Sequence, residues 1–235
     1  MTNDARFQRL KILIGEENFL KLSAATVAIF GIGGVGSFTV EALARSGIGH
    51  LVLIDKDNVD ITNINRQIHA LTSTVGKSKV EVLRERIFEI NPAAKVDTIQ
   101  KFYLPDEPVE NFFICDYDYV VDAIDTITAK ISLVLECQRR GIKIISSMGA
   151  GNKLDPTQFK VADIFQTAVD PVAKVMRKKL KEYGVQNLKV VYSEEMPRKV
   201  SAEKIIGSAA FVPSVAGLIL AAEVVRELGI KGTRD

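Results

Sequence analysis

A glycine-rich turn is the feature of this sequence whose residue types and spacing best suit chemistry on phosphate. Gly31, Gly33 and Gly36 follow directly after the uncharged run 26–30, and helix-forming residues come next, at 40–45. A strand, a glycine turn and a helix in this order can hold an anion. Glycine lets the backbone come close, and the first helical turn offers unpaired N–H groups and a positive dipole end. The motif therefore predicts a nucleotide site.

Acidic and cationic side chains downstream indicate how the nucleotide is used. Asp55 ends the second predicted strand, 24 residues after Gly31, about where a carboxylate can accept ribose hydroxyls. The loop 56–67 is dense in Asn, Arg and Gln, and Lys79 lies beside Lys77 at the start of the next predicted helix. Cations suit cleavage of a nucleoside triphosphate, because negative charge builds on the leaving pyrophosphate. A hydride-transfer enzyme would instead need an ordered nicotinamide pocket.

Alternating strands and helices predict the scaffold that positions these residues. The expected fold class is α/β: a Rossmann-like, doubly wound, mostly parallel sheet with helices on both faces and an N-terminal helical extension. Ligands of such sheets lie at the carboxyl ends of the strands, where the glycine turn, Asp55, Asp122–Asp125 and Gly149–Gly151 all fall.

The predicted strands are 26–30, 51–55, 96–99, 117–122, 142–146, 159–165 and 188–192. The predicted helices are two short ones within 4–22, one ending near 46, and then 77–89, 127–140, 170–183 and 213–228. Asp125 or Thr126 is placed to cap the helix 127–140.

Composition narrows the class of partner. Hydrophobic residues make up 47% of the 235 positions, and the net charge of +2 gives no overall basic field that demands nucleic acid. Residues 174–204 nevertheless hold nine basic residues against four acidic ones, which suits a polyanionic partner, although a solvated helix face explains it at least as well. There is no disulfide scaffold, no signal-peptide-like run and no membrane-length apolar run. A cytoplasmic protein without a membrane partner is expected.

Five sequence blocks resemble the adenylating enzymes of the ubiquitin-activating type, a family that includes the ThiF and MoeB proteins. The agreement in order and spacing extends over roughly residues 6–151, and the blocks are 31–36, 53–57, 63–67, 75–79 and 122–125. The resemblance implies one nucleotide-binding domain over 1–235. Its parts would be N-terminal helices at 1–24, an ATP-binding core at 25–151, and substrate-side strands and helices at 152–235.

The resemblance also implies a role for individual residues in cleaving ATP. The nucleotide-binding residues would be Gly31, Gly33, Gly34, Gly36, Asp55, Asp57, Asn63, Gln67 and Asp122. The glycines would pass close to the phosphates and Asp55 would hold the ribose hydroxyls. The catalytic residues would be Arg66, Lys79, Asp125 and Arg9.

Within this set, Arg66 and Lys79, with Asn63, would bind the triphosphate, and Asp125 would hold Mg2+ or the reacting geometry. Arg9 in relatives reaches the triphosphate of the neighbouring subunit, which implies a homodimer. The nucleophile would be the substrate's own carboxylate, which is ionised at neutral pH and needs no general base, so catalysis is positioning and electrostatics.

Other polar and sulfur-containing residues have plainer explanations. Asp122 could equally well cap the end of its strand, and His50 and His69 are expected to be structural. Cys115 and Cys137 are expected to be buried small hydrophobic residues. No Cys-x-x-Cys pair occurs, which excludes the four-cysteine zinc site common among sulfur-carrier activators.

Four further segments resemble the dehydratase branch of the family, which acts on threonylcarbamoyladenosine in tRNA: 66–71, 89–92, 149–157 and 170–174. This resemblance implies that ATP activates the threonyl carboxylate and that the carbamoyl nitrogen closes a hydantoin ring, with net loss of water. The implied partners are the anticodon loop of tRNA and a cysteine desulfurase or sulfur-relay protein. The basic stretch 174–204 offers a surface for such a loop, and we expect Lys178, Lys179 and Lys181 to help dock it. The alternatives are an adenylyltransferase for the C-terminus of a ubiquitin-like sulfur carrier, and a non-catalytic nucleotide-binding module or dinucleotide reductase.

Overall fold

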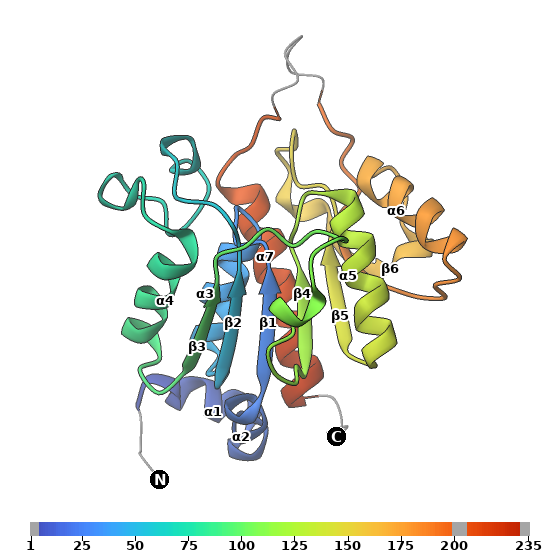
Figure 1. Cartoon of the computed structure of the whole chain (residues 1–235). Coiled ribbons are helices and arrows are strands. Elements are labelled where there is room, and N and C mark those ends of the chain that lie inside the picture. Colours follow the sequence, from blue (N-terminus) through green and yellow to red (C-terminus); the bar gives the residue numbers. More distant parts are fainter. Residues whose placement is uncertain (1–4, 199–205, 231–235) are drawn as a thin grey trace.

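A seven-stranded sheet lies at the centre of the computed structural model, which describes residues 5–198 and 206–230 (Figure 1). Its strand order is β3-β2-β1-β4-β5-β7-β6, and every pairing is parallel except that of β6 with β7. The strands are β1 (Thr26–Phe30), β2 (His50–Ile54), β3 (Lys95–Ile99), β4 (Tyr119–Asp122), β5 (Lys143–Ser147), β6 (Phe159–Asp163) and β7 (Lys189–Ser193). The predicted doubly wound, mostly parallel sheet is confirmed.

Helices cover both faces of this sheet (Figure 1). They are α1 (Gln8–Ile14), α2 (Glu16–Ala24), α3 (Gly36–Arg45), α4 (Lys79–Ile90), α5 (Ile127–Arg140), α6 (Pro171–Glu182) and α7 (Phe211–Val225), which continues into the π-helical turn Arg226–Ile230. Apolar side chains of α3, α4 and α7 form one core, α5 packs in the core of the opposite face, and α6 packs beside α5. No helix in the described ranges is long and apolar enough to cross a membrane.

The central strands are apolar on both sides because both faces are covered. Val27 and Ile29 of β1 belong to the core with α3 and α7, whereas Ala28 and Phe30 belong to the core with α5. All four side chains are fully buried. Successive strand residues point to opposite faces, so a strand buried on both sides becomes a continuous apolar run, as the sequence shows here.

The structure differs from two predictions, the capping of α5 and the length of the strand that begins at residue 159. Thr126 precedes α5, but neither it nor Asp125 caps the helix, and the Thr126 hydroxyl instead donates to Asp125 Oδ1 at 3.3 Å. The predicted strand 159–165 ends early, at Asp163. The Asp163 carboxylate accepts the N–H of Phe165 at 2.8 Å and starts a 3-10 turn, Ile164–Gln166. Side chains of Asp commonly compete with sheet pairing in this way. Residues 199–205, which include part of the predicted polar loop 193–207 and the end of the basic stretch 174–204, lie outside the described residues, whereas Lys174 to Arg198 of that stretch are described.

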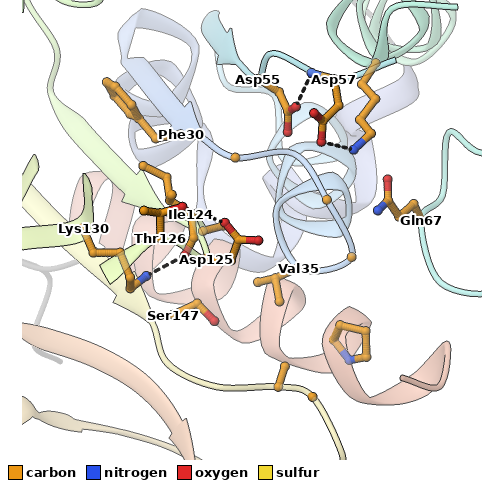
Figure 2. Close-up of a pocket in the computed structure, with 18 of the residues that line it drawn as sticks. Phe30, Val35, Asp55, Asp57, Gln67, Ile124, Asp125, Thr126, Lys130 and Ser147 are labelled. Carbon is orange, nitrogen blue, oxygen red and sulfur yellow. Dashed lines mark hydrogen bonds and ion pairs between the residues drawn. The ribbon is translucent and has the colours of Figure 1, made fainter. Parts of the chain in front are cut away.

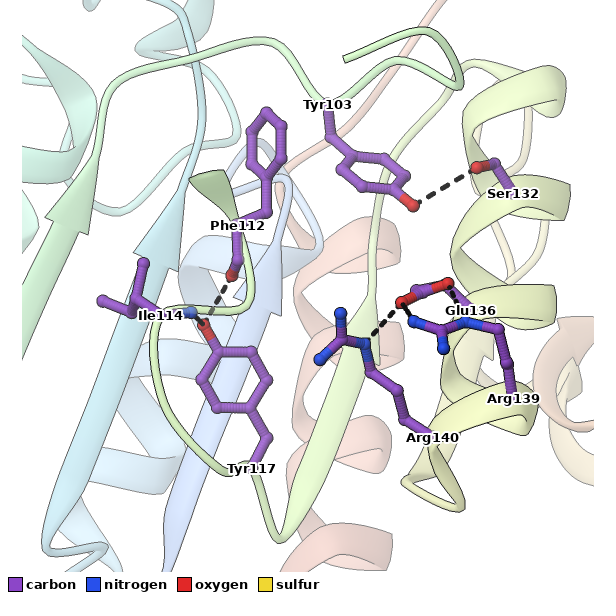
Figure 3. Close-up of polar contacts among 8 residues, drawn as sticks. All are labelled: Tyr103, Phe112, Ile114, Tyr117, Ser132, Glu136, Arg139 and Arg140. Atoms are coloured by element: carbon purple, nitrogen blue, oxygen red, sulfur yellow. Dashed lines mark hydrogen bonds and ion pairs between the residues drawn. The ribbon is translucent and has the colours of Figure 1, made fainter. Parts of the chain in front are cut away.

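The segment between β3 and β4 is held by polar contacts within itself and by contacts with α5 (Figure 3). The Tyr117 hydroxyl donates to the carbonyl of Phe112 at 2.5 Å, and the Tyr103 hydroxyl lies 3.3 Å from that of Ser132 on α5. The guanidinium of Arg140 lies over the ring of Phe113, 4.6 Å from its centroid. These contacts matter because Phe102 and Tyr103 of this segment form an aromatic wall of the cavity described next.

Candidate active site

A cavity of about 680 Å3 opens at the carboxyl ends of β1, β2, β4 and β5 (Figure 2). This volume lies within the range of small-molecule sites, roughly 300–1,000 Å3. Its walls come from the glycine turn after β1, the loop after β2, the loop after β4 and the loop after β5. Parallel strands bring these loops to one edge of the sheet, so the predicted convergence is observed.

The glycine turn packs too tightly for side chains at two positions. Gly31 has φ +82°, and a Cβ there would lie 2.7 Å from the carbonyl oxygen of Ala123. A Cβ on Gly36 would lie 1.9 Å from the carbonyl oxygen of Gly31. Gly31, Gly33 and Gly34 line the cavity, but Gly36 does not. Gly36 is the first residue of α3 and packs against the Gly31 carbonyl, so its predicted contact with phosphate stays a prediction.

The carboxylate of Asp55 is held in place by two backbone groups. Its Oδ2 accepts the N–H of Ile32 at 2.9 Å, and its Oδ1 accepts the N–H of Asp57 at 2.9 Å. Asp55 lines the cavity directly after β2. A carboxylate oxygen has more than one acceptor position, so both oxygens can still accept the hydroxyls of a ribose.

A cationic wall faces the glycine turn. Lys79, the first residue of α4, is 4% exposed, and its Nζ lies 3.0 Å from Asp57 Oδ2. Arg66 lines the cavity, and its Nη1 donates to the carbonyl of Thr62 and to Asn65 Oδ1, both at 2.9 Å. The remaining donors of both cations are available to a polyanion in the cavity, because a guanidinium has five and an ammonium three.

A short capped turn brings the other predicted ligands to this wall. Asp60 caps the 3-10 turn Ile61–Asn63, and its N–H donates to Asn63 Oδ1 at 3.1 Å. The N–H groups of Arg66 and Gln67 then both donate to the carbonyl of Asn63. Asn63 and Gln67 are buried residues that line the cavity, and Gln67 Oε1 has no hydrogen-bond partner among the described residues.

A buried ion pair forms the floor beneath the loop after β4. Asp122 is fully buried and does not line the cavity, and its Oδ2 lies 2.9 Å from Lys130 Nζ and accepts the Ser146 hydroxyl at 2.5 Å. Asp122 Oδ1 accepts the N–H of Ile124 at 3.1 Å, while Lys130 Nζ donates to the Ile124 carbonyl at 3.0 Å. Asp122 is thus placed to shape the loop rather than to touch a nucleotide, as its alternative explanation had it.

Asp125 is the carboxylate that this floor presents to the cavity (Figure 2). Both backbone polar groups of the preceding residue, Ile124, are bound to the Asp122–Lys130 pair. Within the described ranges, Asp125 accepts only the long hydrogen bond from Thr126. No three His, Cys, Asp or Glu residues of these ranges converge into a metal site. Mg2+ commonly uses one or two carboxylates plus phosphate oxygens, and Asp125 fits that pattern.

The sequence interpretation missed Lys130, although a signal was present. Lys130 is followed at helical spacing by Leu133, Val134 and Cys137, all of them buried on one face of α5. A lysine on such an apolar stripe must find an anionic partner inside the fold. It is 1% exposed and pairs with Asp122.

The expectations for the cysteines and histidines were partly confirmed and partly wrong. Cys137 is buried as expected, but Cys115 is exposed. His50 is structural, with Nε2 2.8 Å from Asp97 Oδ2. His69 is 2% exposed, neither ring nitrogen has a partner among the described residues, and burial, together with Lys79, lowers its pKa to about 4. Its ring is therefore neutral at physiological pH.

Arg9 lies on α1 and does not line the cavity of its own chain. The predicted contact of Arg9 with a neighbouring subunit stays a prediction. Of the four predicted catalytic residues, Arg66, Lys79 and Asp125 line the cavity of one chain, and Arg9 does not.

The fold and the site define the class of protein. A Rossmann-like sheet carries a glycine turn, the carboxylate of Asp55 and a cationic wall at one edge, and the sequence profile of the ThiF family matches residues 7–234. The chain therefore belongs to the ThiF family.

Particular relatives are close. The tRNA threonylcarbamoyladenosine dehydratase of Bacillus subtilis is 49% identical over 240 residues, covering 95% of this chain and 94% of the relative. The Escherichia coli enzyme of the same name is 45% identical over 181 residues, covering 77% of this chain and 67% of the relative. The crystal structure of E. coli tRNA N6-threonylcarbamoyladenosine dehydratase, TcdA, in complex with AMP superposes with a TM-score of 0.92, at 38% identity, covering 100% of this chain and 99% of the other.

Proposed function

We propose that this chain is an ATP-dependent tRNA threonylcarbamoyladenosine dehydratase that works through an acyl adenylate. The observation that carries the proposal is the near-complete match, in sequence and in structure, to dehydratases of that name, including TcdA bound to AMP and to ATP. The cavity supports it independently, because Asp55, the glycine turn and Asp125 line it together at one edge of the sheet.

ATP would lie across the cavity from the aromatic wall to the cationic wall. Asp55 would accept the ribose hydroxyls, and at Gly33 and Gly34, which line the cavity, the backbone would approach the phosphates. Arg66 and Lys79 would stabilise the charge that develops on the leaving pyrophosphate. Asp125 would hold Mg2+, which supplies further neutralisation of phosphate charge when it is bound.

The reaction needs two substitutions. A threonyl carboxylate oxygen attacks the α-phosphorus of ATP, the bond to the β-phosphate oxygen breaks, and pyrophosphate leaves. The carbamoyl nitrogen then attacks the activated carbonyl carbon and loses its proton, and AMP leaves with the former carboxylate oxygen. A five-membered ring results, and the modified adenosine has lost one water. The protein's part is to orient these groups and to balance charge.

The basic face of α6 is our candidate for docking tRNA. Lys178, Lys179 and Lys181 are exposed on this helix, and Lys179 also pairs with Glu182 at 2.9 Å. Lysine contacts to phosphate give affinity without sequence preference and weaken with salt. Reversing all three charges should weaken tRNA binding while ATP binding stays intact, and reversing the exposed Lys143 at the start of β5 is the control. Unchanged tRNA binding at moderate salt would reject this docking face.

A homodimer is proposed because Arg9 lies away from its own cavity. The same helix, α1, exposes Ile12 and Leu13, at 79% and 80%, as a surface suited to a second copy. Mixing an Arg9→Ala chain with a Lys79→Ala chain tests the shared site. Random pairing would rebuild one intact site in half of the dimers, so about a quarter of the wild-type activity should return. No recovery, with dimers present, would place Arg9 outside the reaction.

A product assay tests the proposed function. The protein is incubated with ATP and tRNA bearing threonylcarbamoyladenosine, the tRNA is digested, and the masses of its nucleosides are measured by mass spectrometry. The expected result is a modified adenosine lighter by one water, with pyrophosphate and AMP formed in equal amounts. A parallel incubation with a small protein ending in Gly-Gly tests the rival adenylyltransferase. Pyrophosphate formed only in that incubation would overturn the proposal.

The cell compartment and the relay partner belong to the same proposal. We propose that this chain works in the cytoplasm, because the substrate proposed for it is a tRNA. A cysteine desulfurase or sulfur-relay protein is proposed as a further partner, and co-purification from cells with a tagged chain, followed by mass spectrometry, tests it. Absence of any such protein from the purified complex would remove this partner.

A further inference from the structure

Two residues that do not line the cavity, Lys153 and Asp170, form a second buried ion pair. Lys153 lies in the loop after β5, and Asp170 precedes α6. Lys153 Nζ lies 2.8 Å from Asp170 Oδ2, and the side chains are 1% and 0% exposed. Buried charges are costly, and an apolar pair of similar size is often as stable or more so. The pair therefore calls for an explanation beyond stability.

Each partner makes a second bond that reaches toward the cavity or α6. Lys153 Nζ donates to the carbonyl of Gly149 at 2.7 Å, and Gly149 lines the cavity. Asp170 Oδ1 accepts the N–H of Ala173 at 3.0 Å and so caps α6, whose second residue, Val172, also lines the cavity. A Cβ on Gly149 would lie 3.2 Å from Asp170 Oδ2, so this wall has little slack.

The backbone on both sides is bent to make this junction. Val169, directly before Asp170, has φ +65°, a left-handed conformation that is strongly disfavoured for a β-branched residue. Asn152, directly before Lys153, has φ +57°, and its Oδ1 accepts the N–H of Gly207 at 2.6 Å. Such conformations persist only where the surroundings fix them, and they gather at functional sites.

We infer that Lys153 and Asp170 are positioning residues for the group that accepts AMP, which is the carboxylate carried by the tRNA. They join the start of α6 rigidly to the cavity wall at Gly149, on the side away from Asp55 and the ribose position. A polyanion docked along the basic face of α6 is thereby held in a fixed relation to the α-phosphate. This inference rests on the proposed function, and it names the wall past which the acceptor enters.

The test compares removal of one charge with removal of both. Lys153→Met keeps the length of the side chain but leaves Asp170 buried and unpaired. The double variant Lys153→Met with Asp170→Asn removes both charges and keeps an oxygen to cap α6. The readouts are thermal unfolding, the Kd for ATP, and kcat and KM for threonylcarbamoyladenosine tRNA. Lys189→Met, which breaks an ion pair of β7 with Glu223 at 3.1 Å, is the control for stability alone.

The inference predicts that Lys153→Met lowers kcat/KM for the tRNA at least tenfold while the Kd for ATP changes less than twofold. The double variant should regain thermal stability but not activity, because the Gly149 carbonyl stays untethered. Lys189→Met should lose stability and keep kcat/KM. Activity restored in the double variant, or unchanged in Lys153→Met, would overturn the inference. A wild-type chain that does not dehydrate the tRNA at all would instead refute the proposed function.

Discussion

Replacing Lys130 with methionine should be among the most damaging single changes to the folded state. The variant leaves the Asp122 carboxylate fully buried, with only the Ile124 N–H and the Ser146 hydroxyl as donors. Breaking a buried pair by removing one partner costs about 3–5 kcal/mol. For a chain of this size, that corresponds to a fall in Tm of about 6–20 °C. Loss of the bond to the Ile124 carbonyl should also let Asp125 drift and lower kcat.

Urea denaturation of the wild type, Lys130→Met, and Lys130→Met combined with Asp122→Asn measures this effect. The double variant no longer buries a charge, and its Asn oxygen can still accept from Ile124 and Ser146, so it should recover at least about 2 kcal/mol of the loss. A single variant that loses less than about 1 kcal/mol, or a double variant no more stable than the single, would refute the electrostatic account of the floor.

Three further predictions follow from the same geometry. Gly36→Ala should lower the free energy of unfolding by more than about 3 kcal/mol, because the new Cβ would clash with the Gly31 carbonyl. Gly33→Ala should lower it by about 1 kcal/mol or less, because a Cβ there would lie 3.7 Å from its nearest neighbour. Urea denaturation of both variants measures the difference. The pKa of His69 is about 4 in the folded chain and 6.5 in the unfolded chain, so the unfolded chain binds more protons between these pH values. The free energy of unfolding should therefore fall by about 2 kcal/mol from pH 7.5 to pH 5. A His69→Gln variant whose free energy of unfolding falls equally with pH would contradict this. Lys79→Ala should lower kcat for AMP formation roughly 100-fold or more with little loss of folding, and an equal loss in the exposed neighbour variant Lys77→Ala would show that the effect is not specific.

Local sequence pattern was enough to predict the scaffold and the edge of the sheet that carries the site. Buried strands such as 26–30 are continuous apolar runs, and glycine marks the turn that follows. In a parallel sheet the residues after each strand must gather at one edge, so Asp55 and Asp125 could be placed together without coordinates.

Contacts between distant segments could not be predicted in the same way. Lys153 and Asp170 belong to a loop and a helix cap, and no periodicity relates them. The resemblance implied that Asp122 binds the nucleotide, with capping of its strand as an equal alternative, but Asp122 pairs with the buried Lys130 and does not line the cavity. The exposure of Cys115 likewise depends on how the segment between β3 and β4 folds back, which the sequence pattern does not specify.

Isotope transfer tests the central claim, that the cavity activates a carboxylate by joining it to AMP. The tRNA is prepared with 18O in the threonyl carboxylate of threonylcarbamoyladenosine, and the products formed with unlabelled ATP are weighed. The account predicts that one labelled oxygen appears in AMP and none in pyrophosphate, because the attacking oxygen stays on the α-phosphorus when the ring closes. Unlabelled AMP, or label in inorganic phosphate together with ADP, would contradict it.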